Sequence, residues 1–267
     1  MRKSILIFIA VLAAVLIGCL IGPLSKEKKM PALSETDPEF AASWDNFINS
    51  DVKPHGRLDP ATRFLLLLAA HIAAGAPQEY EILLTEALDN GAEPAAVKEV
   101  VYQAVPYLGM AKVYEFLQIT NRVLAAKGIK LPLDHLGTTA ADNRLEKGLA
   151  VQRAIFGDRI DDMRAAAPQD LKHIQDYLSA NCFGDYYTRG GLDLKTRELL
   201  TFSLLISLGG ADSQVKSHVQ GNLNIGNDRE TLIDAVTQLL PYIGYPRSLN
   251  AIAAINDLTF SNQGENK

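Results

Sequence analysis

The sequence predicts an all-α protein in which one helical unit occurs twice, after an amino-terminal signal or anchor segment. Apolar residues recur at the three- and four-residue spacing of helices, and no segment alternates with a period of two for long enough to form a strand. A block of residues from the first half also reappears in the second half. Since 48% of the 267 residues are hydrophobic and 21% are charged, the chain can bury a core without metal or disulfide support.

Charge and cysteine usage exclude several classes of protein. The chain has 26 basic and 31 acidic residues and a net charge of -5, with no dense run of Lys and Arg in its body, so we expect no nucleic-acid partner. Cys19 and Cys182 lie far apart and neither belongs to a CxxC pair, which argues against a zinc ribbon or a dithiol site. The five histidines are scattered without HxxxH spacing, so we expect no metal site.

The amino terminus has the pattern of an export signal. Arg2 and Lys3 precede an apolar run over residues 5–24, and we exclude residues 1–24 from fold reasoning. The segment Leu16-Ile17-Gly18-Cys19 resembles the lipobox of bacterial lipoproteins, which predicts cleavage before Cys19 and lipidation of that residue. The alternative is an uncleaved anchor that spans the bilayer. Either form predicts an exported, membrane-tethered protein in the periplasm or at the cell surface.

The internal repeat covers most of the body. The segment LDPATRFLLLLAAHIAAGA from Leu58 matches LDLKTRELLTFSLLISLGGA from Leu192, 134 positions later. After a gap of one residue the match resumes at a distance of 135, where Pro106, Tyr107 and Gly109 pair with Pro241, Tyr242 and Gly244. The repeats predict two domains, a first over residues 34–127 and a second over residues 140–260 that includes an amino-terminal helical extension.

Each repeat is predicted to contain four helices. The third is the clearest, because Val97, Val100, Val101, Ala104 and Val105 follow one helical face, as do Leu232, Ala235, Val236, Leu239 and Leu240. Pro94 suits the first turn of one copy and Asn227 with Glu230 forms a capping box in the other, while Pro106 and Pro241 are expected to end them.

The remaining segments are predicted to be helical on either side of a linker. Residues 35–49, around Trp44, are interpreted as a helix that closes the first repeat, and residues 127–139 as the linker. Two or three further helices, around residues 143–156 and 168–180, precede a turn-rich segment, FGDYYTRGG.

His218 is the candidate catalytic residue. Gln214, His218 and Asn222 are spaced by four residues and therefore share one helix face, where amides can orient an imidazole that exchanges protons near neutral pH. The alternative is a structural histidine bonded to Gln214 or to a backbone carbonyl. Leu83 occupies the corresponding position of the first repeat, so one site per chain is predicted. His71 is interpreted as a buried structural histidine bonded to backbone.

Both repeats resemble the carboxymuconolactone decarboxylase family, the all-helical group that includes the AhpD-type alkylhydroperoxidases. The resemblance is carried by FGDYYTRGGLDLKTRELLT, GGADSQVKSHVQGNLNIG and LPYIGYPRSLNAI, and it covers most of residues 58–127 and 140–260. The peroxidase branch uses a CxxC pair followed by a histidine. Ala211 and Gln214 stand at those two positions, so disulfide-cycling peroxidase chemistry is disfavoured here.

The decarboxylase branch keeps the histidine without the cysteine pair. The resemblance therefore implies a cofactor-free lyase or isomerase that acts on a small carboxylated lactone, with His218 delivering a proton and Gln214 orienting it. Glu198 corresponds to the family's active-site glutamate in that Phe64 replaces it in the first repeat, but its spacing to His218 differs by one residue. A solvent-facing helix glutamate is the alternative.

Arg189 and Arg197 are candidates to bind the substrate carboxylate, because a guanidinium binds carboxylates in a bidentate manner. Arg197 has a structural alternative, a pair with Asp193 or a helix cap, since Arg63 occupies its position in the first repeat. The resemblance also implies a homo-oligomer, a trimer of tandem chains. Two further functions stay open, a noncatalytic binding or scaffold protein and the disfavoured thiol peroxidase.

Overall fold

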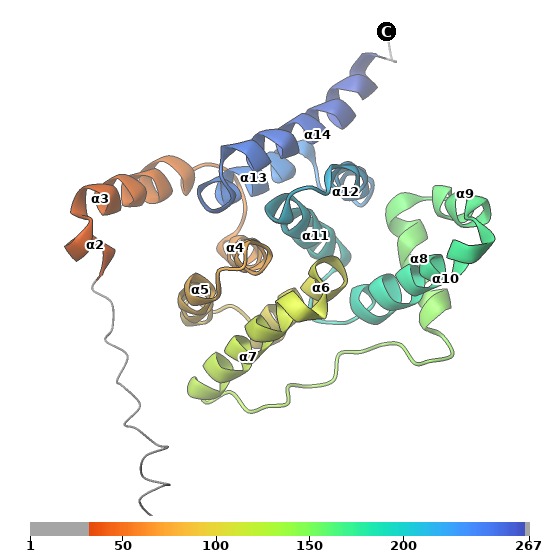
Figure 1. The fold of residues 1–267 in the computed structure, drawn as a ribbon, viewed down its shortest axis with the longest axis horizontal. Helices are drawn as coiled ribbons and strands as arrows, with labels where there is room; N and C mark the ends of the chain where they lie inside the picture. Colours follow the sequence, from red (N-terminus) through yellow and green to blue (C-terminus); the bar gives the residue numbers. More distant parts are fainter. Residues whose placement is uncertain (1–31, 265–267) are drawn as a thin grey trace, which may run out of the picture. The chain divides into compact units, whose positions relative to one another are not determined.

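The computed structural model describes the backbone of residues 32–264 and the side chains of residues 32–260. This part of the chain forms thirteen α-helices and three short helical segments, with no strand (Figure 1). The all-α prediction is confirmed. The predicted signal or anchor over residues 1–24 lies outside the described residues, and no helix among those described is long and apolar enough to cross a membrane.

The chain divides into two units. The first ends at Asn46 and the second begins at Phe47. The first contains the short helix α2 (Leu33–Thr36) and α3 (Pro38–Asn46), in which the rings of Phe40 and Trp44 stack with centroids 6.4 Å apart. The second begins with a π-helical segment, η1 (Phe47–Val52), and contains the four equivalent helices of each repeat. The helix predicted around Trp44 is therefore present, divided into these elements.

The two repeats contain the same four helices, and their bounds match except that the last helix is longer in the second repeat. Within the second unit, the pairs of equivalent helices are α4 (Pro60–Ala74) and α11 (Leu194–Leu208), α5 (Pro77–Asp89) and α12 (Asp212–Asn224), α6 (Pro94–Leu108) and α13 (Arg229–Ile243), and α7 (Met110–Ala126) and α14 (Tyr245–Gly264). Asp59 and Asp193 cap α4 and α11 by accepting from the backbone N–H of Thr62 and Thr196. The same N-cap hydrogen bond therefore begins the first helix of each repeat.

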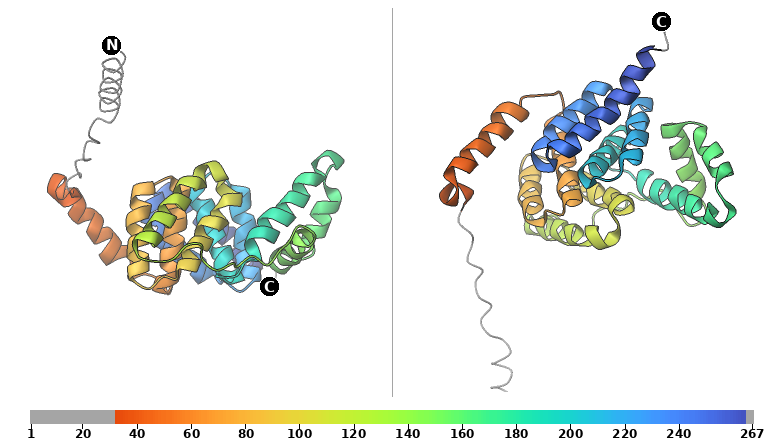
Figure 2. Two further views of the ribbon diagram at one scale, coloured as in Figure 1. Left: turned by 90° about the horizontal axis from the view of Figure 1, so that it is seen from below. Right: turned by 45° about the horizontal axis from the view of Figure 1, so that its top comes forward.

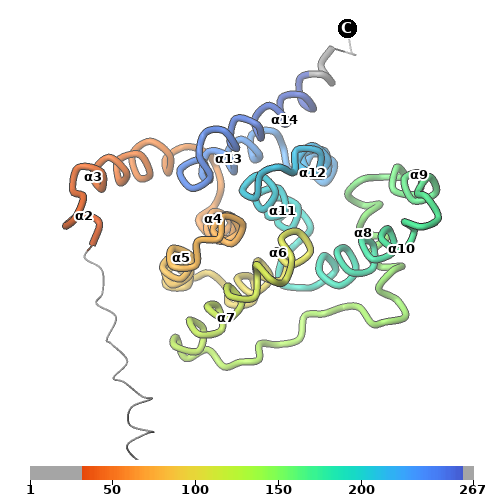
Figure 3. Tube along the Cα trace, viewed as in Figure 1, coloured from red at the N-terminus to blue at the C-terminus, as the bar shows by residue number. Residues whose placement is uncertain are grey.

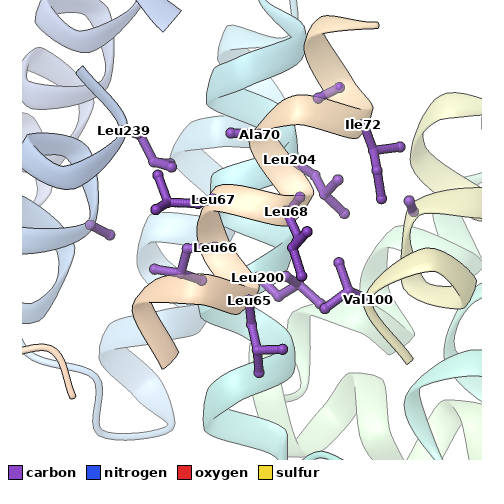
Figure 4. Close-up of a cluster of buried hydrophobic side chains, with 14 of the residues drawn as sticks. Leu65, Leu66, Leu67, Leu68, Ala70, Ile72, Val100, Leu200, Leu204 and Leu239 are labelled. Carbon is purple, nitrogen blue, oxygen red and sulfur yellow. The ribbon is translucent and has the colours of Figure 1, made fainter. Parts of the chain in front are cut away.

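The core lies between α4 and α11, which pack against each other at the centre of the second unit. Leu65, Leu66, Leu67 and Leu68 of α4 are all buried, because α11 covers one side of this helix while α6 and α13 cover others. Figure 4 shows these leucines against Leu200, Leu204 and Leu239. A helix that is apolar all round is stable only when it is enclosed in this way.

Two details of the third helices differ from prediction. Pro106 and Pro241 lie inside α6 and α13, which each continue for two residues to Gly109 and Gly244. Those glycines have φ of 81° and 79°, a backbone conformation that favours glycine, and so they end the helices instead. The cap of α13 is Asp228, which accepts from Thr231 N at 2.8 Å, and Asn227 instead donates to the backbone of Lys195.

An additional helical segment joins the repeats. A helix-free connection leads from α7 to α8 (Arg144–Phe156), as the trace in Figure 3 shows, so the predicted linker is confirmed. Next come α9 (Arg159–Ala166), η2 (Gln169–Leu171), α10 (Lys172–Tyr177) and a π-helical segment, η3 (Leu178–Tyr187). These elements stand at one side of the repeat helices in Figure 2. The segment predicted to be turn-rich is helical up to Tyr187.

Two glycines bring α8 and η3 into close contact. A Cβ added at Gly148 would lie 1.8 Å from Ser179 O, and one added at Gly184 would lie 2.3 Å from Arg144 O. Only glycine fits at such distances, so the two backbones approach closely. Because α8 also packs against α12 and η3 packs against α6, this contact holds Phe156 and Tyr187 beside the second repeat.

Candidate active site

His218 is bonded to Glu198 in the second repeat. His218 Nδ1 lies 2.8 Å from Glu198 Oε2, and both side chains are buried, Glu198 fully. Asn222 ties the two helices together, because its Nδ2 donates to the backbone oxygens of Glu198 and His218. The solvent-facing alternative for Glu198 is therefore wrong, and His218 bonds neither to Gln214 nor to a backbone carbonyl.

A glycine makes room for the buried carboxylate. A Cβ added at Gly221 of α12 would lie 2.8 Å from Glu198 Oε2 and 2.8 Å from the side chain of Ile155. The first repeat has Glu86 at the position of Gly221 and Phe64 at the position of Glu198. The second repeat therefore combines a buried glutamate with a glycine that leaves space for it, and the first repeat has neither residue.

The hydrogen atoms around Glu198 have one consistent arrangement. Tyr187 donates its single hydroxyl proton to Glu198 Oε1 at 2.6 Å, so the hydroxyls of Tyr107, at 3.0 Å, and Thr201, at 2.6 Å, must donate to Tyr187. Cys182 in turn donates to Tyr107. The network ends on Glu198 as an acceptor, and the other oxygen of this carboxylate lies 2.8 Å from His218 Nδ1.

That arrangement leaves the second ring nitrogen of His218 available. Nε2 makes no hydrogen bond to any residue in the described part of the chain, and the imidazole makes edge-to-face contacts with the rings of Tyr107 and Phe156, whose centroids lie 5.8 Å and 5.5 Å away. A carboxylate on Nδ1 fixes the tautomer and balances the charge of an imidazolium. The Glu198 carboxylate therefore holds the ring through Nδ1 and leaves Nε2 without a partner among the described residues.

His218 lines a pocket of about 460 Å³. Its wall is mainly apolar, from Phe156, Ile160, Phe183, Leu205 and Leu208, and the polar groups include Gln214 and Ser217. Ligand sites in proteins commonly combine such a wall with a few polar groups. The site has the volume and the lining to hold a small organic molecule.

Gln214 does not orient the imidazole. Its side chain is exposed, accepts from Ser213 Oγ at 2.9 Å and lines the pocket, whereas Glu198 holds the ring. The prediction that Gln214 orients His218 is therefore wrong in its geometry. The face shared by i and i+4 residues places Gln214 beside the same pocket without bringing it to the ring.

Tyr107, Tyr187 and Gly221 were not predicted as site residues. Tyr107 and its repeat counterpart Tyr242 were visible as a matched pair, but a repeat match does not reveal that Tyr107, from the first repeat, reaches the site of the second. Tyr242, from the second repeat, instead packs on His71 of the first repeat, with ring centroids 4.9 Å apart. His71 bonds to Leu67 O at 2.7 Å, and burial lowers its pKa, which confirms a structural histidine.

Comparison with known proteins adds to this geometry. A family model described as the carboxymuconolactone decarboxylase family matches residues 38–122 and 172–257, which together are more than half of the chain. The chain belongs to the carboxymuconolactone decarboxylase family. The two matched segments contain most of the first and second repeats, whereas α8 and α9 of the additional segment lie between them.

Two proteins that have carboxymuconolactone decarboxylase in their names are similar to the chain. The 4-carboxymuconolactone decarboxylase of Acinetobacter baylyi is 26% identical over 124 residues, which make up 46% of this chain and 91% of that protein. A solved structure of a candidate gamma-carboxymuconolactone decarboxylase subunit from Burkholderia xenovorans LB400 has a TM-score of 0.48 and 18% identity, and the match covers 86% of this chain and 90% of that chain.

Arg189 and Arg197 lie apart from His218 in this family member. Arg197 is 1% exposed and donates to Glu99 Oε2 and Gln103 Oε1, both at 3.0 Å, and to two backbone oxygens. Arg197 therefore pairs with Glu99 and not with Asp193. Arg189 also bonds Glu99, at 2.9 Å, and faces a different pocket of about 360 Å³. Neither guanidinium lines the His218 pocket.

Cys182 lines the His218 pocket but is held as a thiol. It is buried, and burial raises its pKa to about 12, although the hydroxyl of Tyr107 opposes this shift. A peroxide-reducing cysteine needs a low pKa and a second thiol. No other cysteine occurs among residues 32–264, and no group of metal-binding side chains is found in the same range.

Proposed function

We propose that this family member is a proton-transfer enzyme, a cofactor-free lyase or isomerase for a small unsaturated carboxylic acid of the lactone type. The observation that carries the proposal is the 2.8 Å bond between His218 Nδ1 and buried Glu198 at the wall of the pocket. A carboxylate that orients an imidazole beside an apolar cavity is an arrangement suited to general acid-base catalysis.

For a lactone carboxylate the proposed reaction is decarboxylation. The bond between the ring carbon and the carboxylate carbon breaks, its electron pair moves into the conjugated carbonyl, and CO2 leaves. The imidazolium of His218 then delivers its Nε2 proton to the substrate carbon, and solvent returns a proton to the ring. The substrate's own carbonyl accepts the electrons, so the step requires no further oxidant or reductant.

The test is turnover by the full chain in detergent, with CO2 release measured on 4-carboxymuconolactone. The same sample in deuterated water reports exchange at carbons next to the carbonyl by NMR. We expect the wild type to show one or both activities. His218→Asn keeps a donor to Glu198 but has no titrating nitrogen, and removal of a general acid-base group typically costs about 100- to 10,000-fold in rate.

The control is His173→Asn, which replaces an exposed histidine outside the pocket lining and should retain most of the activity. Activity that persists in His218→Asn would contradict the assigned role. Absence of both activities in the wild type would favour the scaffold function. Peroxide consumption that survives Cys182→Ser would favour a thiol-independent peroxidase.

We propose further that the chain is exported and tethered through residues 1–24, and that tandem chains assemble as trimers. The lipobox-like segment before Cys19 supports the first proposal. Recovery of the chain in the membrane fraction tests tethering. The mass of the mature amino terminus then tells the two forms apart, because a diacylglyceryl group on Cys19 and an intact Met1 give different values. Light scattering of the detergent-solubilised chain tests the trimer.

A further inference from the structure

One wall of the His218 pocket comes from outside the family match. Gln152 and Phe156 of α8 and Arg159, Ile160 and Met163 of α9 line the pocket, and all five lie between the matched segments 38–122 and 172–257. The matched segments contribute Glu198 and His218. The additional helices therefore line the same cavity as His218, from a part of the chain that the family model does not match.

Gln152 carries an unpaired polar atom in this wall. The residue is 2% exposed, and its Oε1 has no hydrogen-bond partner in the described part of the chain. Most buried polar side-chain atoms in proteins are paired, because an unpaired one loses its bonds to water without replacement. A hydroxyl both donates and accepts, so a hydroxyl on a bound molecule would satisfy this amide in either orientation.

Arg159 is a cation without a protein partner. It is exposed, lines the pocket, and forms no ion pair or hydrogen bond within the described residues. The other arginines nearby are paired: Arg153 donates to both oxygens of Asp161 at 2.9 Å and 2.7 Å, and Arg164 bonds Asp176. Arg159 is thus the free guanidinium of this segment.

The charge of the pocket lining points to an anionic ligand. No Asp or Glu lines the pocket among the described residues, and Arg159 is its one permanent cation. The rest of the wall is mainly apolar. A carboxylate pairs with a guanidinium more strongly than a neutral group does, and an apolar wall favours a hydrocarbon body.

We infer that α8 and α9 form a recognition wall for a hydroxylated, mainly apolar carboxylic acid, whose carboxylate binds Arg159 and whose hydroxyl binds Gln152. This inference rests on the proposed function in so far as the molecule recognised is the substrate of His218. It assigns substrate choice to the additional helices and the chemistry to the second repeat.

Binding is tested with three probes measured by isothermal titration calorimetry on the full chain in detergent. The probes are 3-(4-hydroxyphenyl)propanoic acid, its methyl ester, and 3-phenylpropanoic acid. We expect the hydroxy acid to bind at least about tenfold more tightly than the ester, since a charge-assisted bond is lost. Equal affinities for acid and ester, or no binding at millimolar concentration, would overturn the inference.

The variants separate the two anchoring residues. Arg159→Gln should weaken binding of the acid about tenfold and remove the preference over the ester, whereas Arg153→Gln, which removes a paired arginine, should change neither. The wild type should bind 3-(4-hydroxyphenyl)propanoic acid more tightly than 3-phenylpropanoic acid, which has no hydroxyl for Gln152. Gln152→Met should remove this preference and should raise the melting temperature, because it removes an unpaired buried atom. Equal effects of Arg153→Gln and Arg159→Gln, or a lower melting temperature in Gln152→Met, would contradict these roles.

Failure of the recognition wall is distinguishable from failure of the proposed function. His218→Asn should leave probe affinity nearly unchanged while turnover is lost. Probe binding that depends on Arg159 in a protein without turnover would overturn the proton-transfer function alone. Turnover that is insensitive to Arg159→Gln, in KM as well as in kcat, would overturn the recognition wall alone.

Discussion

Tyr107 donates to the hydroxyl of Tyr187 at 3.0 Å, and through this bond the first repeat contributes to a site whose hydrogen-bonded pair, His218 and Glu198, belongs to the second. Tyr187 donates a hydrogen bond to Glu198, which in turn is hydrogen-bonded to His218. The duplication therefore joins in one chain two halves that both contribute to a single site. At the positions of Glu198 and His218 the first repeat has Phe64, which belongs to the hydrophobic core, and Leu83, which packs against it.

The network predicts that Tyr187 supports both stability and catalysis. Tyr187→Phe removes a donor from buried Glu198 and leaves two hydroxyls without their acceptor, so we expect the free energy of unfolding to fall by about 1–3 kcal/mol. The rate should fall with little change in KM, because Glu198, which holds the ring of His218, loses a hydrogen bond that fixes its position. Urea unfolding and steady-state kinetics measure these effects. Tyr186→Phe is the matched control, since no hydrogen bond of its hydroxyl belongs to this network; an equal loss there would refute the prediction.

A second prediction concerns the two equivalent arginines. Arg197 Nη1 donates to Gln103 Oε1 at 3.0 Å, and Arg63 Nε donates to Gln238 Oε1 at 2.6 Å, so each repeat bonds the third helix of the other. Arg197 also neutralises Glu99, which is 1% exposed. Removing one partner of a buried ion pair costs about 3–5 kcal/mol.

Arg197→Met should therefore destabilise the protein more than Arg63→Met, whose arginine is half-buried and has no carboxylate partner in the described structure. Chemical denaturation at pH 7 measures both variants. Equal losses would show that the bonds to the glutamines dominate and that the pair with Glu99 contributes little.

A third prediction concerns the thiol of Cys182. Because burial raises its pKa to about 12, the native thiol should react very slowly with a thiolate-selective reagent at pH 8. The pKa of the unfolded thiol returns toward about 8.5. The folded state then holds a proton that the unfolded state has released, so this group's contribution to stability is present below the unfolded pKa and is lost as pH rises toward 12.

Dithionitrobenzoate titration of the Cys19→Ser chain measures this reactivity with and without urea. We expect a large acceleration on unfolding, and a native reaction that speeds up only at strongly alkaline pH. Fast labelling of the native protein at pH 8 would show an accessible thiolate and would reopen thiol chemistry at this site.

The sequence alone determined the helical repeats and their order. The capping aspartates, Asp59 and Asp193, and the helical spacing of apolar residues act over a few positions, so both repeats could be predicted from neighbouring residues. The same locality explains the errors at Pro106 and Pro241. A proline indicates a helix end from local rules, yet packing carried both helices on to the next glycine.

Only the tertiary structure decided the partners of the site residues. His218 and Glu198 were both candidates, but their bond, the reach of Tyr107 and the pairing of Arg197 with Glu99 join positions far apart in the chain. Gln214, four residues before His218, was predicted to orient the imidazole, whereas Glu198 holds it. Side-chain spacing along one helix defines a shared face, whereas the partner across that face is set by how helices pack, which periodicity does not encode.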